Sequence, residues 1–201
     1  SIVFTHIPKC AGNSVISFFR NVVAKKDINM ISIVTACSVS SRTNIIKEII
    51  NNFESERKDF QVILGHIPFQ ITKRMYPNSL FTTVLRNPAE QLISSYCSQG
   101  NNITKKDFGM STFIESFDSN INDEWAIDNI QVRMLCNDFR FGKPVNAGML
   151  KDAKNNLIKN YYYEITDNID KFFNNILKLM DTSTDFKPLP KLNSTGKYTK
   201  F

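Results

Sequence analysis

The chain has 201 residues, of which 42% are hydrophobic and 22% are charged, an ordinary composition for a single soluble domain spanning residues 1–201. Lys and Arg outnumber Asp and Glu by 25 to 19, and the net charge of +6 favours anionic partners without selecting one. The four cysteines are too far apart to predict a zinc site or a disulfide framework, and no apolar run is long enough to span a membrane.

The first half of the chain alternates strand and helix patterns. Short apolar runs predict strands at residues 1–7, 29–35, 60–64 and 80–85. Apolar residues at helical spacing predict helices at residues 14–26, 42–57 and 89–97. Strands that alternate with helices indicate an α/β fold with a central parallel sheet flanked by helices on both faces.

The second half is predicted to be mainly helical. Its apolar patterns predict helices at residues 111–117, 124–136, 147–158 and 168–180, with a short strand at 161–163. Residues 100–110 are polar and read as an exposed loop. Residues 181–201 are polar and end in a basic run, which suits either a tail or a lid over an anionic ligand.

Polar residues follow three of the predicted strands, where ligands bind in open α/β sheets. These residues are Lys9, His66 and Arg86. The loop after the first strand could hold an anion, because Gly12 permits close approach, Lys9 adds charge and Ser14 could act as a cap or hydroxyl donor. The loop lacks the Walker A order, which disfavours a standard ATPase or GTPase. An ordinary strand-to-helix turn would also explain Gly12 and Ser14, but not Lys9.

A second polar stretch begins at Arg86, at the end of the fourth predicted strand. Its spacing puts Ser94 two turns into the following helix, so that both side chains could face one phosphate. The alternative is a solvated arginine and an unrelated serine on a helix surface.

Together the two stretches resemble sulfotransferases that use 3′-phosphoadenosine 5′-phosphosulfate (PAPS). Residues 8–14 match Pro-Lys-x-x-Gly-x-Ser, and residues 86–96 match Arg-[Asp/Asn]-Pro-x-x-x-x-x-Ser-x-Tyr. Further blocks resemble the carbohydrate branch, typified by heparan sulfate and uronyl 2-O-sulfotransferases; they lie at residues 65–69, 129–133, 153–158, 161–166 and 193–197. The resemblance covers nearly the whole chain in one order and implies a P-loop-like three-layer fold.

The resemblance also implies a set of donor-binding residues. Those around the 5′-phosphosulfate are Pro8, Lys9, Cys10, Ala11, Gly12, Asn13 and Ser14. The 3′-phosphate is assigned to Arg86 and Ser94, and the C-terminal loop adds Ser194, Thr195 and Lys197. In residues 129–133, alternate spacing cannot place Asn129, Gln131 and Arg133 on one helix face, so at least one of them is expected to be structural.

Lys9 and His66 are the predicted catalytic residues. Lys9 would stabilise charge on the departing oxygen, and His66 would take the proton of an acceptor hydroxyl, because histidine titrates near neutrality. A carboxylate base remains an alternative, no metal is expected, and the other histidine, His6, is expected to brace the loop or core.

The acceptor is the part least specified by the sequence. The animal 2-O enzymes have His-Gly-His where this chain has Leu64-Gly65-His66, and the chain is shorter than theirs. The expected partner is a hydroxyl acceptor, an oligosaccharide, polysaccharide or glycolipid, and not a nucleic acid. A kinase with an atypical phosphate loop and a non-catalytic polyanion-binding module remain alternatives. Unpaired cysteines and the absence of an anchor favour a cytoplasmic bacterial enzyme over a trimmed domain from the Golgi lumen.

Overall fold

The computed structural model describes residues 1–25, 28–33, 60–99, 129–138 and 144–180. These residues form a five-stranded sheet in the order β2-β3-β1-β4-β5, and each neighbouring pair is parallel. The strands are β1 (Ile2–Thr5), β2 (Met30–Ile33), β3 (Val62–Gly65), β4 (Leu80–Leu85) and β5 (Tyr161–Ile165). The predicted central parallel sheet is therefore confirmed, with β1 in its middle.

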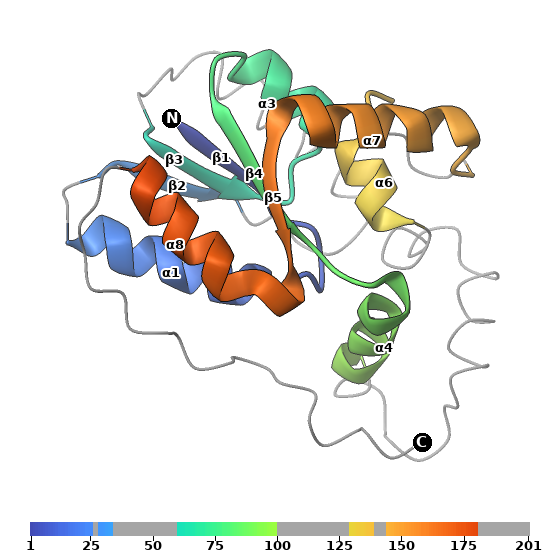
Figure 1. The fold of residues 1–201 in the computed structure, drawn as a ribbon, viewed down its shortest axis with the longest axis horizontal. Coiled ribbons are helices and arrows are strands. Elements are labelled where there is room, and N and C mark those ends of the chain that lie inside the picture. Colours follow the sequence, from blue (N-terminus) through green and yellow to red (C-terminus); the bar gives the residue numbers. More distant parts are fainter. Residues whose placement is uncertain (26–27, 34–59, 100–128, 139–143, 181–201) are drawn as a thin grey trace.

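Helices cover both faces of the sheet (Figure 1). On one face lie α1 (Gly12–Ala24) and α8 (Ile169–Leu179), which follows a short 3-10 helix, η2 (Thr166–Asn168). On the other face lie α3 (Phe69–Met75), α6 (Ile130–Leu135) and α7 (Ala147–Asn160). The remaining helix, α4 (Pro88–Gln99), follows β4 and extends beyond the sheet. This arrangement confirms the three-layer α/β fold.

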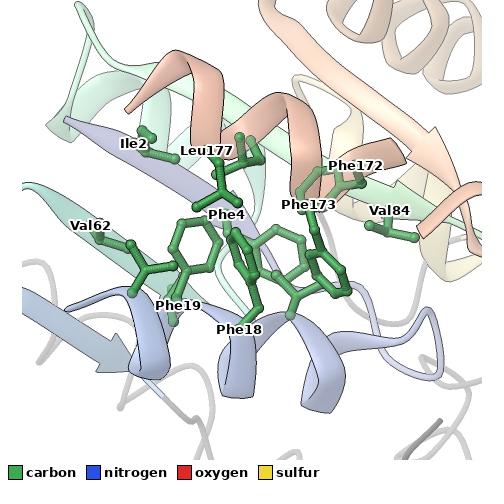
Figure 2. Packing of buried hydrophobic residues seen from close by; sticks show 13 residues of the cluster. Ile2, Phe4, Phe18, Phe19, Val62, Val84, Phe172, Phe173 and Leu177 are labelled. Carbon is green, nitrogen blue, oxygen red and sulfur yellow. The ribbon is translucent and has the colours of Figure 1, made fainter. Parts of the chain in front are cut away.

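The core between α1, α8 and the sheet is rich in phenylalanine (Figure 2). Residues at helical spacing on α1 bring Phe18 and Phe19 inward, and α8 contributes Phe172 and Phe173 in the same way. The rings of Phe18 and Phe173 stack with their centroids 4.5 Å apart. Phe4 of β1 lies among them, so α1 and α8 are fixed against the central strand.

A second core fills the opposite face of the sheet. Since successive strand residues point to opposite faces, Val3 packs on this side while Phe4 packs on the other. Phe69 of α3 meets both Phe81 and Tyr161, with ring centroids 5.3 and 5.4 Å apart. Strands β1, β3 and β4 are buried on both faces, which explains why their sequences are almost continuous apolar runs.

Several element boundaries differ from the predictions. The first strand ends at Thr5, and the helix predicted from residue 14 begins at Gly12. The short strand predicted at 161–163 extends to Ile165, and helix α3 was not predicted. The helices predicted at 42–57 and 111–117, the loop at 100–110 and the segment 181–201 lie outside the described residues.

Candidate active site

Three loops meet at the carboxyl edge of the sheet, because the strands that precede them are parallel neighbours. The backbone N–H of His6 donates to the Gly65 carbonyl at 2.8 Å, which continues the pairing of β1 with β3. Nδ1 of His66 lies 2.7 Å from the His6 carbonyl oxygen. On the β4 side, Nη1 of Arg86 donates to the Lys9 carbonyl at 3.2 Å. The structure therefore brings the loops of Lys9, His66 and Arg86 together at one edge, and the roles of these residues in catalysis and donor binding stay predictions.

The loop between β1 and α1 has an unusual backbone. Lys9 and Ala11 both adopt left-handed conformations, with φ of 63° and 57°. Such conformations cost about 1–2 kcal/mol in a residue other than glycine, and they concentrate at functional sites. Left-handed residues in a turn also direct backbone N–H groups into a concavity that can bind an anion.

The N-terminus of α1 has no side-chain cap. Ala11 is the N-cap residue and cannot accept a hydrogen bond through its methyl group, and the first turn contains no acidic residue. The first helical bond joins the N–H of Val15 to the Ala11 carbonyl at 3.1 Å, so the N–H groups of residues 12–14 have no partner within the helix. The proposed capping role of Ser14 is therefore wrong, and its role as a hydroxyl donor stays a prediction. This terminus is suited to an anionic ligand.

Gly12 is required by its neighbour His6. A Cβ atom at position 12 would lie 1.6 Å from Nε2 of the His6 imidazole. The His6 ring is buried between Phe4 and His66, whose ring centroids lie 6.1 and 4.0 Å from it. Burial, with a smaller contribution from the charge of His66, lowers the pKa of His6 to about 3. His6 is therefore neutral at neutral pH and braces the loop, as expected.

The tautomer of His66 follows from its hydrogen bond. The His6 carbonyl oxygen can only accept, so Nδ1 of His66 must carry the proton that it donates. The lone pair of the neutral ring is then on Nε2. His66 is half-buried at the strand end, and this tautomer suits a general base.

Arg86 connects the two stretches on which the resemblance rests. Besides its bond to Lys9, its Nε lies 3.3 Å from Oε2 of Glu90, in the first turn of α4. The Arg86 side chain is 22% exposed and that of Glu90 is 51% exposed, so Glu90 could yield to a stronger anion. Ser94 lies on α4 and is partly buried, and its sharing of a phosphate with Arg86 stays a prediction.

The other residues of the predicted loop contribute mainly through the backbone. Cys10 is buried and its N–H donates to the Ile7 carbonyl at 3.2 Å. Burial raises the pKa of its thiol to about 12, partly opposed by Arg86, so the thiol stays protonated. Pro8 is buried and Asn13 is exposed. Ser194, Thr195 and Lys197 lie outside the described residues.

Two glutamines lie behind these loops. Gln131 contacts the backbone of Arg86, while Gln91 donates to the Pro8 carbonyl at 2.7 Å. Gln131 therefore has a structural contact, as expected for at least one residue of its block. The role of Gln91 was missed, and its only sequence signal was a polar residue inside the Arg86 stretch. Nearby, Arg133 is buried and Asn129 is an exposed left-handed N-cap residue.

A comparison with solved structures finds a sulfotransferase from Alicyclobacillus acidocaldarius. The two structures align with a TM-score of 0.57 at 12% sequence identity, over 97% of this chain and 86% of that chain. The chain has the fold of that sulfotransferase. No protein-family model and no curated protein matches the sequence.

The described residues contain no group of three or more His, Cys, Asp or Glu side chains that could hold a metal ion. None of the helices in the described ranges is both long and apolar enough to cross a membrane.

Proposed function

We propose that the protein is a sulfotransferase that transfers the sulfuryl group of PAPS to a hydroxyl group. The observation that carries the proposal is the hydrogen bond from Arg86 to the Lys9 carbonyl. It joins the stretch that resembles a phosphosulfate loop to the stretch that resembles a 3′-phosphate motif. The fold shared with a sulfotransferase supports the same conclusion.

The donor would be held through both of its anionic ends. The N–H groups at the start of α1, together with Lys9, suit the 5′-phosphosulfate because they combine a helix N-terminus with a point charge. Arg86 and Ser94 suit the 3′-phosphate, and Ser194, Thr195 and Lys197 would complete the site. PAPS supplies an activated sulfuryl group, and the residues of this chain orient it.

His66 and Lys9 would act on opposite sides of the transferred group. Nε2 of His66 would accept the proton of the acceptor hydroxyl as the new S–O bond forms. Lys9 would stabilise the negative charge on the oxygen from which sulfur departs, as cations do in phosphoryl transfer. The Nδ1–H bond to the His6 carbonyl holds the His66 ring in the tautomer that this role needs.

The acceptor is proposed to be a saccharide hydroxyl, in an oligosaccharide, a polysaccharide or a glycolipid. The proposal rests on the resemblance to the carbohydrate branch, and the net charge of +6 suits an acidic chain. Only one histidine of the His-Gly-His block is present, so the position that is sulfated need not be the same as in the 2-O enzymes.

Ligand-induced thermal shifts test the proposal. We expect 3′-phosphoadenosine 5′-phosphate (PAP) to stabilise the protein by about 2.7 kcal/mol at one hundred times its Kd, and ADP or ATP to stabilise it much less. This corresponds to a rise in Tm of roughly 5–10 °C. Stronger stabilisation by ATP with magnesium would instead indicate a kinase. Stabilisation by heparin with no response to any nucleotide would indicate a polyanion-binding module.

A further inference from the structure

The Arg86 peptide group is held at two points by one side chain. Oε1 of Gln131 accepts from the Arg86 N–H at 3.1 Å, and Nε2 of Gln131 donates to the Arg86 carbonyl at 2.8 Å. The pairing of β4 with β5 ends at Leu85, so Arg86 is the first residue beyond the sheet. Gln131, on α6, therefore gives Arg86 the two backbone bonds that a neighbouring strand would otherwise supply.

A second glutamine extends this contact to the loop after β1. The second N–H of Gln131 Nε2 donates to Oε1 of Gln91 at 3.0 Å, and Nε2 of Gln91 donates to the Pro8 carbonyl at 2.7 Å. Gln91 is only 5% exposed. Both hydrogens of the Gln131 amide have acceptors, and each amide oxygen has a donor, so neither amide can rotate by 180° without facing like groups.

We propose that Gln131 and Gln91 are positioning residues that couple the two ends of the donor site. They fix the Arg86 backbone relative to Pro8, and hence the 3′-phosphate contact relative to the phosphosulfate loop. This inference rests on the proposed function, because it assigns the two loops to one nucleotide. Neither glutamine touches the donor in this assignment, since each acts through the backbone of a residue that does.

The spacing between the two loops matters because PAPS carries its 3′-phosphate and its 5′-phosphosulfate on one ribose, which limits the distance between them. The direct Arg86–Lys9 bond is half-buried and involves a long, flexible side chain. The glutamine pair is anchored on α4 and α6, and it forms hydrogen bonds with backbone groups and within the pair itself. Removing it should therefore misplace the arginine while leaving the N-terminus of α1 in place.

The test measures the preference for a 3′-phosphate, which is the Kd of 5′-AMP divided by the Kd of PAP. These ligands differ only in that phosphate. We expect Gln131→Met to lower the preference about tenfold, since a misplaced arginine loses a charge-assisted bond. Gln91→Met should lower it in the same direction. The control is Gln61→Met, which removes an exposed glutamine that accepts from the Asn29 N–H at the amino edge of the sheet.

A double-mutant cycle separates positioning from general loss of stability. Adding Gln131→Met to Arg86→Ala should cause no further fall in the preference, because the arginine through which Gln131 acts is already absent. An unchanged preference in folded Gln131→Met and Gln91→Met proteins overturns the inference but not the proposed function. Unfolding of both variants also overturns it, because the pair would then be part of the framework. A wild-type protein that does not prefer PAP to AMP overturns both.

Discussion

The two histidines at the carboxyl edge of the sheet are joined by a hydrogen bond to which His6 contributes its backbone and His66 its side chain. His6 offers its backbone carbonyl and a buried neutral ring, whereas His66 donates through Nδ1 and keeps its lone pair on Nε2. The stacked rings, with centroids 4.0 Å apart, hold this arrangement. The sequence predicted a bracing role for His6 from its place beside the loop, and a catalytic role for His66 from its residue type, its place at a strand end and the family resemblance. It could not supply the tautomer, which depends on a contact between residues 60 positions apart.

His66→Asn tests the proposed base while keeping the local contact. The asparagine amide can still donate toward the His6 carbonyl, but it cannot accept a proton at neutral pH. We expect kcat to fall by about 100- to 10,000-fold, the usual contribution of a general base. The affinity for PAP should change little, because His66 is not assigned to the donor. Sulfate transfer assays and PAP titrations measure both quantities, and wild-type turnover in this variant would exclude His66 as the base.

The stability of the protein should fall in mild acid because of His6. The pKa of His6 is about 3 in the folded chain, whereas the ordinary pKa of a histidine side chain, taken for the unfolded chain, is 6.5. Between these values the unfolded chain binds a proton that the folded chain does not, so the free energy of unfolding decreases as the pH falls. Between the two pKa values, protonation of this one histidine lowers the free energy of unfolding by at most about 1.4 kcal/mol for each pH unit. Denaturant titrations at pH 7 and pH 4.5 measure it.

The matched variant for this measurement is His6→Phe, which keeps a flat ring but does not titrate. Its stability should depend less steeply on pH over the same interval, whatever its absolute stability. Equal pH slopes for the two proteins would show that His6 is not the group responsible.

At the scale of elements, the start of α1 shows how a local contact overrides a sequence pattern. Ser14 looked like a helix cap, yet the helix begins at Gly12 behind the left-handed Ala11. The helix can begin at residue 12 because glycine has no Cβ atom, which at this position would overlap the His6 ring. Helix α3 was missed because it has only seven residues, too few to display a clear apolar period.

Gly12→Ala should destabilise the protein by about 2–3 kcal/mol, because a methyl group would overlap the His6 ring in a packed site. The neighbouring Ala11→Gly is the control. It should be neutral or stabilise by up to about 1 kcal/mol, since glycine adopts the left-handed backbone without strain. Urea denaturation of both variants measures the difference. A stable Gly12→Ala protein would show that the His6 ring can move aside at little cost.

At the scale of the whole molecule, the order of the strands determines on which side of the Lys9 loop each of the other two site loops lies. β1 lies between β3 and β4, so the Lys9 loop has His66 on one side and Arg86 on the other. The sequence predicted that the strand ends would gather at one edge, because alternating strands and helices indicate a parallel sheet. It could not predict which strands are neighbours, since pairing depends on contacts distant in sequence. The glutamine pair was hidden for the same reason, because it joins residues 40 to 83 positions apart.

Under the proposed function, this order predicts that donor and acceptor approach the Lys9 loop from opposite sides, the 3′-phosphate from β4 and the acceptor from β3. Arg86→Ala should therefore raise the KM for PAPS by about tenfold or more, through loss of a charge-assisted contact, and leave the KM for the acceptor nearly unchanged. Arg20→Ala, an exposed arginine on α1, is the control for loss of positive charge and should change neither value. Initial rates measured while each substrate is varied give both constants. An equal rise in the two KM values for Arg86→Ala would contradict the division, because the arginine would then serve both substrates.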